Sequence, residues 1–149
     1  MADGLPDGYA ISTDPGRIDV DFVHRYLSEE SYWARGVPRD VVARSIANSL
    51  CFGLYGPDGR QAGFARVVTD RATFAWLADV FVDDRHRGRG LGKALVGTIL
   101  RHPELQGLRR FMLSTADAHG LYTPFGFAPP SRPERLLAIV AADPYRARS

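Results

Sequence analysis

The sequence has little cysteine and no long apolar run, and each absence removes a class of protein. Cys51 is the single cysteine, so an intrachain disulfide and a multi-cysteine metal site are both excluded. Its apolar surroundings, "SLCFGLYG", favour a buried core residue. No stretch approaches the roughly 20 apolar residues that a membrane-spanning helix needs, and the opening "MADGLPDG" has no signal-peptide core. We predict a soluble, cytoplasmic protein that does not act at a membrane and holds no metal.

A strong excess of charge of one sign is also missing. The chain has 19 Lys and Arg against 17 Asp and Glu, a formal net charge of +2. This balance argues against a general nucleic-acid binder, so any basic residues that matter act locally. The apolar content of 45% is ordinary for a globular protein. A length of 149 residues suits one domain over 1–149, with flexible ends at 1–8 and 142–149.

Apolar periodicity and turn signals predict the order strand, two helices, three strands, helix, strand, short helix, strand. The predicted strands cover residues 8–15, 50–55, 61–70, 73–82, 108–115 and 135–141. The predicted helices cover residues 16–27 and 39–50, a segment from Leu91 to just before Pro103, and a short helix within 116–127. Hairpins followed by a strand-helix-strand crossover indicate an α+β (mixed α/β) fold with helices on the faces of a mixed sheet.

The stretch "DDRHRGRGLGKAL", residues 83–95, gathers cations at the start of a predicted helix. Cations are unfavourable there because a helix start already carries partial positive charge and free N–H groups. A bound pyrophosphate would turn them into counter-charges, and the glycines would let it approach the backbone. The alternative is a solvated basic turn. A nucleoside-triphosphate loop is excluded because Ala94 follows Lys93 where that motif requires Ser or Thr. A dinucleotide-binding fingerprint is excluded because Lys93 stands where its third glycine belongs.

Two motifs point to one family. The basic stretch fits R-x-x-G-x-G through Arg85, Gly88 and Gly90, directly after the strand "ADVFV", and "TADAHGLYTPFGF" later places a tyrosine just before a Gly-Phe pair. Together they resemble the GCN5-related N-acetyltransferase (GNAT) superfamily, over nearly the whole chain. The resemblance implies a mostly antiparallel, twisted sheet with splayed fourth and fifth strands and about four flanking helices. It also implies an acetyl-CoA-dependent N-acetyltransferase acting on the primary amine of a small molecule or amino-acid-like substrate.

The same resemblance implies where acetyl-CoA binds. Backbone groups of Val80, Phe81 and Val82 would pair with the pantetheine arm, and the N–H groups from Arg87 to Gly92 would hold the pyrophosphate. This second set comprises Arg87, Gly88, Arg89, Gly90, Leu91 and Gly92. Side chains of Arg85, Arg87 and Lys93 would add positive charge. His119 would contact the cofactor or orient the tyrosine, the alternative being a helix cap near solvent.

Tyr122 matches the acid of the family by position, since a phenol with a pKa near 10 can protonate a leaving thiolate. The alternative is a tyrosine packed against Phe125 or Phe127. Asp79 lies at the expected splay point and is a candidate base, either directly or through water. The alternatives are a salt bridge to Arg66 and a reaction that uses ordered water alone. Strand alternation predicts that Phe74 and Trp76 lie on the face opposite Asp79.

Tyr32, Trp33 and Arg35, in the loop "SYWARGVP", are candidate substrate contacts, although the aromatics can equally fasten the loop to the core. Arg39 is an equal candidate for binding a substrate carboxylate. A non-catalytic acyl-CoA-binding domain of the same fold remains an alternative function, and a nucleic-acid module built on the basic turn is a weaker one. The predicted last strand, "RLLAIVA", would supply a homodimer edge by strand exchange or sheet extension.

Overall fold

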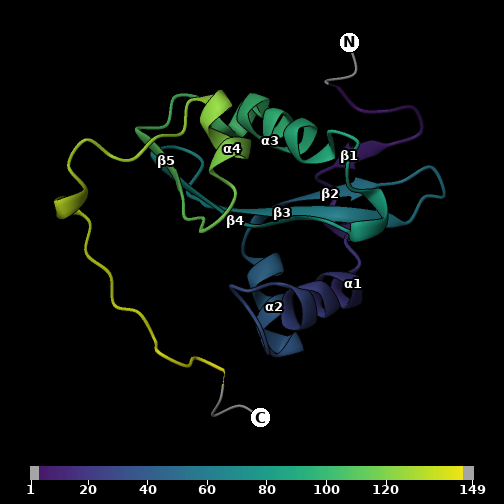
Figure 1. The fold of residues 1–149 in the computed structure, drawn as a ribbon, viewed down its shortest axis with the longest axis horizontal. Helices are drawn as coiled ribbons and strands as arrows, with labels where there is room; N and C mark the ends of the chain where they lie inside the picture. Colours follow the sequence, from purple (N-terminus) through teal and green to yellow (C-terminus); the bar gives the residue numbers. More distant parts are fainter. Residues whose placement is uncertain (1–3, 146–149) are drawn as a thin grey trace.

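A computed structural model describes residues 4–145 of the chain. One five-stranded sheet forms its centre, with the strands side by side in chain order (Figure 1). The strands are β1 (Ala10–Ser12), β2 (Leu50–Tyr55), β3 (Gln61–Thr69), β4 (Phe74–Val82) and β5 (Arg110–Leu113). β1 to β4 pair antiparallel, and β5 pairs parallel to β4. The predicted mostly antiparallel mixed sheet is therefore confirmed, and the parallel pair is the one that the helical crossover joins.

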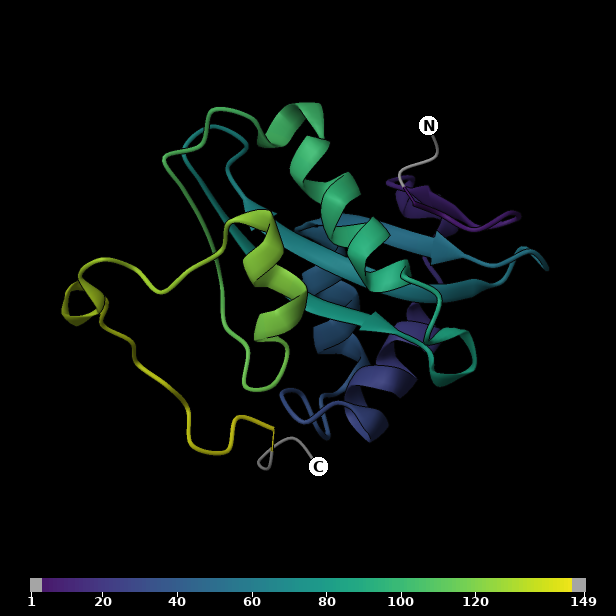
Figure 2. The same ribbon diagram turned by 45° about the horizontal axis from the view of Figure 1, so that its top comes forward.

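Helices cover both faces of this sheet (Figures 1 and 2). One face carries α1 (Val20–Arg25), continued by a π-helical turn (Tyr26–Glu30), and α2 (Arg39–Ala47). The other carries α3 (Leu91–Arg101) and α4 (His119–Tyr122). The sequence predicts an apolar stripe on α3 at Leu91, Ala94, Leu95, Thr98 and Ile99, all of which are buried except Thr98, which is partly buried. Each helical layer closes its own apolar cluster against the sheet. The predicted α+β class with about four flanking helices is confirmed.

The hairpin between β2 and β3 follows from its turn residues. Gly59 has a φ of +81°, a conformation that glycine adopts without steric cost. The Gly56 N–H donates to the Arg60 carbonyl at 2.9 Å and closes the turn. "GPDGR" therefore forms the predicted connection, and both strands are almost entirely buried.

β4 and β5 separate part-way along their length. Their pairing runs from Phe74 opposite Arg110 to Leu77 opposite Leu113, where β5 ends, while β4 continues to Val82. A β-bulge in β4 lies just beyond the last pair, because Asp79 and Val80 together oppose the single residue Ala65 of β3. The splay that the family resemblance implied is present, and the bulge accompanies it.

The predicted final strand over 135–141 is wrong. Residues 136–141 have no regular structure, and their side chains are exposed, as is every residue from 128 to 144. The segment extends away from the sheet and returns toward the layer of α1 and α2 (Figures 1 and 2). Its composition is right for a strand, but no neighbouring strand within residues 4–145 pairs with it. A strand needs such a partner for its backbone groups.

Parts of the predicted flexible ends, residues 1–3 and 146–149, lie outside the described residues. No helix within residues 4–145 combines the length and apolar content required to cross a lipid bilayer. The cytoplasmic location stays a prediction.

Candidate functional site

The basic stretch forms a loop that leaves β4 and opens α3. Gly88 and Gly90 have φ angles of +80° and +74°, and Gly90 occupies the N-cap of α3. A Cβ atom added at either glycine would meet nothing within 4 Å, so the backbone here faces open space. Within the described chain, the N–H groups of residues 88–93 have no hydrogen-bond acceptor. Six free N–H donors at a helix start are the arrangement that the predicted anion site requires.

Contacts inside the protein hold two of the loop arginines. Arg87 donates to the Tyr26 hydroxyl at 2.7 Å and to the Val82 carbonyl at 3.1 Å. Arg89 donates to the Tyr9 hydroxyl at 2.9 Å. The N–H of Arg87 itself donates to the Asp84 carbonyl, so the free donors begin at Gly88 rather than at Arg87. These tyrosine contacts set the loop conformation before any anion binds.

Arg85 and Lys93 stand on the outside of the same loop. Both side chains are exposed. Arg85 reaches the carboxylate of Asp83, a buried residue, at 3.2 Å, and its own side chain is 80% exposed. The charge of Lys93 is therefore available to a bound ligand, whereas Arg85 shares its charge with Asp83, and Arg87 shares its charge with Asp84 at 2.9 Å.

Asp79 occupies the β-bulge where the two strands separate. Its φ of +55° is uncommon for a residue with a side chain, although aspartate tolerates it better than most. One carboxylate oxygen accepts from Arg66 Nε at 2.9 Å and the other from Trp33 Nε1 at 2.8 Å. Only 11% of the Asp79 side chain and 19% of that of Arg66 are exposed. The salt bridge that was the alternative to a catalytic role is therefore formed. The loop "SYWARGVP", hereafter the aromatic loop, supplies Trp33 as a second partner of Asp79.

The bulge also changes the face on which Asp79 lies. Arg66 of β3 stands opposite Ala78, and Val68 stands opposite Trp76, so Arg66 and Trp76 share one face. Asp79 reaches Arg66 on that face. The predicted placement of Asp79 opposite Trp76 and Phe74 is wrong, because simple alternation counts no extra residue.

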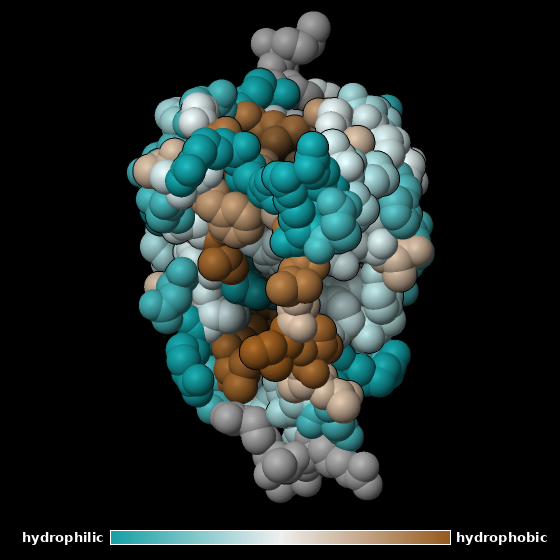
Figure 3. Space-filling view, turned by 90° about the vertical axis from the view of Figure 1, so that its left-hand side faces the viewer, coloured by the Kyte–Doolittle hydropathy of each residue, from teal (hydrophilic) through white to brown (hydrophobic). Residues whose placement is uncertain are grey.

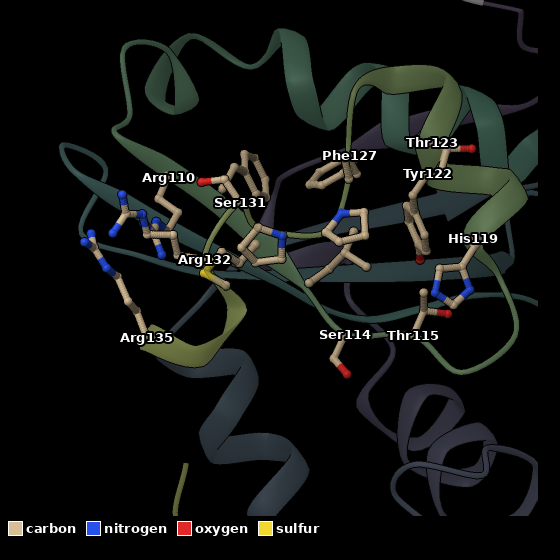
Figure 4. A pocket seen from close by; sticks show the side chains of 16 residues that line it. Arg110, Ser114, Thr115, His119, Tyr122, Thr123, Phe127, Ser131, Arg132 and Arg135 are labelled. Carbon is tan, nitrogen blue, oxygen red and sulfur yellow. The ribbon is translucent and has the colours of Figure 1, made fainter. Parts of the chain in front are cut away.

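Tyr122 lies in a cavity of about 560 Å³ on the outer side of β5 (Figure 4). His119 lies beside it, and Ser114 and Thr115 line the same end. The Tyr122 side chain is buried, and this burial raises the pKa of its phenol to about 12. Its ring meets that of Phe127 edge to face at 5.9 Å. The predicted acid is therefore a protonated donor facing a cavity, and the alternative packing against Phe127 is present as well.

The aromatic loop spans the open end of the splay. Trp33 binds Asp79 on β4, while the Tyr32 hydroxyl accepts from the Ala116 N–H at 2.9 Å, just beyond β5. The two rings meet edge to face at 5.0 Å, and about half of each residue is exposed. Arg35 points elsewhere, donating to the Glu29 carbonyl at 3.1 Å. The structure thus brings Tyr32, Trp33 and Asp79 together and leaves Arg35 outside that group.

Sequence reasoning missed Tyr9 and Tyr26, which fix the basic loop. Tyr26 stacks on Phe81 of β4 with ring centroids 3.9 Å apart, and burial raises the pKa of its phenol. Tyr9 also lies 2.7 Å from His86 Nδ1. Both tyrosines come from the first 26 residues and act on a loop more than 60 residues away. Apolar periodicity predicts a helix over residues 16–27 that contains Tyr26, but no local signal pairs this tyrosine with Arg87.

Comparison with known proteins agrees with this geometry. The family model described as "Acetyltransferase (GNAT) family" matches residues 19–127, from the N-cap of α1 to the Gly-Phe pair. The chain belongs to the GNAT family. The match contains the basic loop, both splayed strands and Tyr122, and the predicted family membership is confirmed.

Similar proteins support the assignment along most of the chain. FG08082 of Gibberella zeae, named for an acetyltransferase, is 34% identical over 135 residues, covering 76% of this chain and 75% of that protein. A crystal structure of a GNAT-family protein from Xanthomonas campestris pv. campestris is 49% identical with a TM-score of 0.91, covering 95% of this chain and 99% of that one. A predicted acetyltransferase from Clostridium acetobutylicum, crystallised with acetyl-CoA, shares the fold at 13% identity, with a TM-score of 0.66 and coverage of 89% and 94%.

Proposed function

We propose that this GNAT protein transfers the acetyl group of acetyl-CoA to the primary amine of a small molecule or amino-acid-like substrate. The observation that carries the proposal is the row of free N–H groups at residues 88–93, at the end of a strand that has separated from its neighbour. Such a site suits a pyrophosphate, and the adjoining gap suits an extended chain that pairs with the strand edge. The Clostridium acetobutylicum protein of similar fold was crystallised with acetyl-CoA.

In this proposal, residues 88–92 donate their N–H groups to the pyrophosphate, and the exposed Arg85 and Lys93 add charge. The fit is supported by the open space above Gly88 and Gly90, where a side chain would otherwise block the backbone. Backbone groups from Val80 to Val82 pair with the pantetheine arm, because β5 ends before it reaches them. His119 then lies near the thioester end, beside Tyr122.

Acetyl-CoA supplies an acyl group on a sulfur leaving group. The protein has to donate one proton to this sulfur and remove another from the attacking ammonium. We assign Tyr122 as the acid that donates to the sulfur as the carbon–sulfur bond breaks and the carbon–nitrogen bond forms. A pKa of about 12 keeps this phenol protonated at every working pH. The same rise in pKa makes complete proton transfer to the sulfur harder. Hydrogen-bond donation to the developing thiolate is therefore its main contribution, with the proton following as charge builds up.

Asp79 is our candidate for the base that takes the proton of the attacking ammonium, through an intervening water. Arg66 and Trp33 each engage one of its oxygens but leave lone pairs on both, because an ionised carboxylate can accept about four hydrogen bonds. The Arg66 cation offsets part of its charge, which favours a water-mediated route over direct abstraction. Ordered water acting alone is the competing route, and it predicts that an Asp79→Asn variant keeps most of its turnover.

Tyr32 and Trp33 form the proposed wall of the amine site, since they lie across the open end of the splay. Arg35 uses one of its guanidinium donors on Glu29 and keeps the others for a substrate carboxylate. This assignment predicts that substrates carry an apolar or aromatic portion next to the amine. Because Arg35 lies outside the group of Tyr32, Trp33 and Asp79, it would add affinity only for a substrate whose carboxylate extends beyond this wall.

Calorimetry with acetyl-CoA tests the cofactor assignment. We expect micromolar binding by the native chain and a loss of at least tenfold in Gly90→Asp, whose carboxylate would repel the pyrophosphate. Gly107→Asp is a matched control, because Gly107 also has a positive φ, +73°, and open space around its Cβ position. It should bind like the native chain. If the native chain binds neither acetyl-CoA nor another acyl-CoA, the proposal is wrong.

Turnover is tested separately, by following free thiol release from acetyl-CoA across a panel of small amines and amino acids. Amine-dependent release establishes the transferase reaction. Tight acetyl-CoA binding with no release for any amine would favour the non-catalytic acyl-CoA-binding domain instead.

A further inference from the structure

The segment 136–141, "LLAIVA", is hereafter called the arm. It has the composition of a buried strand in an exposed position. Leu137, Ile139 and Val140 are 94%, 105% and 80% exposed, and Leu136 is 41% exposed. Four large aliphatic side chains within six residues form an apolar surface that proteins normally cover. Leu137 and Ile139 also alternate with Ala138, as a strand with one apolar face requires.

An unpaired sheet edge with a cavity beside it lies on the same chain. β5 ends the sheet, because β4 is the one strand that pairs with it among residues 4–145. The cavity of about 560 Å³ runs along this outer edge from Arg110 to Thr115. Its far wall is the segment 127–132, which forms no strand pairs. Figure 3 shows this side of the molecule hollowed, with both hydrophobic and hydrophilic residues around the hollow. An unpaired sheet edge beside such a hollow is a template for one more strand.

The chain directs its arm away from its own edge. Pro129, Pro130 and Pro133 stiffen the segment before the arm, since each fixes its φ and disfavours a helical turn in the residue before it. Beyond the arm, Tyr145 packs against the apolar cluster of α1 and α2, on the other side of the sheet. The arm is thus held extended at both ends and lies away from β5 (Figures 1 and 2).

We propose that the arm adds as a strand to the outer edge of β5 in a second copy of this chain, and that the two copies exchange arms. Each copy has one unpaired arm and one unpaired edge, so a two-fold dimer satisfies both at once. Added main-chain hydrogen bonds would join the strands, while the aliphatic side chains fill the hollow. The arm of one copy then closes the cavity that holds Tyr122 and His119 in the other.

The first test is the molar mass in solution, measured by light scattering without acetyl-CoA, so that its result is independent of the proposed function. The native chain should have twice the 16.4 kDa of one copy. The double variant Leu137→Lys/Ile139→Lys should have the mass of one copy, because it would lose the aliphatic contacts and bring two positive charges into a cavity lined by Arg110, Arg132 and Arg135. Its folding is expected to be unaffected, because both side chains are exposed. Val68→Lys is the matched control on an apolar residue of β3 that is 41% exposed, and it should remain a dimer.

Hydrogen exchange locates the contact. Amides of β5 and of the arm should be protected in the native dimer and should exchange fast in the double variant. A native chain with the mass of one copy overturns the proposal, and protected arm amides in such a monomer would place the arm on its own β5. A native dimer that survives both lysines would also overturn it, since its contact would lie elsewhere.

Discussion

The ion pair between Arg66 and Asp79 offers a stringent test of the site geometry, because it lies in the bulge that opens the sheet. Replacing Arg66 by Met leaves a carboxylate that is 11% exposed with Trp33 as its one remaining partner. We expect a loss of about 3 kcal/mol, the lower end of what removing one member of a buried pair costs. Asp79→Asn keeps the side-chain shape and should cost about 2 kcal/mol.

The double variant Arg66→Met/Asp79→Asn separates the pair from the individual side chains. It leaves no unpaired charge, so we expect a loss of about 3 kcal/mol instead of the sum of about 5. The difference, about 2 kcal/mol, is the coupling energy. Asparagine is the appropriate replacement because it tolerates the positive φ of Asp79, whereas alanine would add roughly 1 kcal/mol of backbone strain.

Urea unfolding followed by circular dichroism measures all three losses, which avoids a signal from Trp33. The exposed pair Arg44–Asp40, with side chains 65% and 58% exposed, serves as the control cycle. Its coupling should stay below about 0.5 kcal/mol. Losses that add within about 0.5 kcal/mol for Arg66 and Asp79 would refute the buried pair. Turnover of Asp79→Asn in the same preparation then decides between a carboxylate base and water alone.

Three further predictions concern tyrosines and the cysteine. Tyr122→Phe should lower kcat about 10² to 10⁴-fold with unchanged acetyl-CoA affinity. The native pH–rate profile should show no loss of activity from deprotonation of Tyr122 until the pH nears 12. Equal kcat in both proteins would show that Tyr122 takes no part in the reaction. Burial raises the pKa of the Cys51 thiol to about 11, so thiol labelling at pH 8 should be at least 100-fold slower than in urea. Because this pKa is raised on folding, the protonated thiol stabilises the folded state below pH 9, and this stabilisation is lost as the pH rises to 11. Unfolding curves of Cys51→Ala should not show this loss of stability. Tyr26→Phe removes the hydroxyl that holds Arg87 and should weaken acetyl-CoA binding roughly tenfold, a loss of about 1.4 kcal/mol, whereas unchanged binding would show that the loop needs no such support.

The family, the order of the elements from β1 to α4 and the glycine-containing loop before α3 could all be predicted from the sequence, because each rests on local signals. The signal for the loop consists of the glycines at 88 and 90, the strand before them and the apolar stripe after them. All of these lie within about 20 residues of one another. The β2–β3 hairpin and the end of α4 at Tyr122, two residues before Pro124, are local in the same way. Backbone preferences and apolar periodicity are properties of short segments, so they do not depend on the rest of the chain.

The tertiary structure alone decided where Asp79 points, which tyrosines hold the loop and what becomes of the arm. The bulge at Asp79 reverses the faces of β4 beyond it, and strand alternation carries no mark of the inserted residue. Tyr9 and Tyr26 reach Arg89 and Arg87 through the fold, across 80 and 61 residues of sequence. The arm has the sequence of a strand but does not form one, because a strand requires a neighbouring strand to pair with. The sequence of a segment does not specify which neighbour is available.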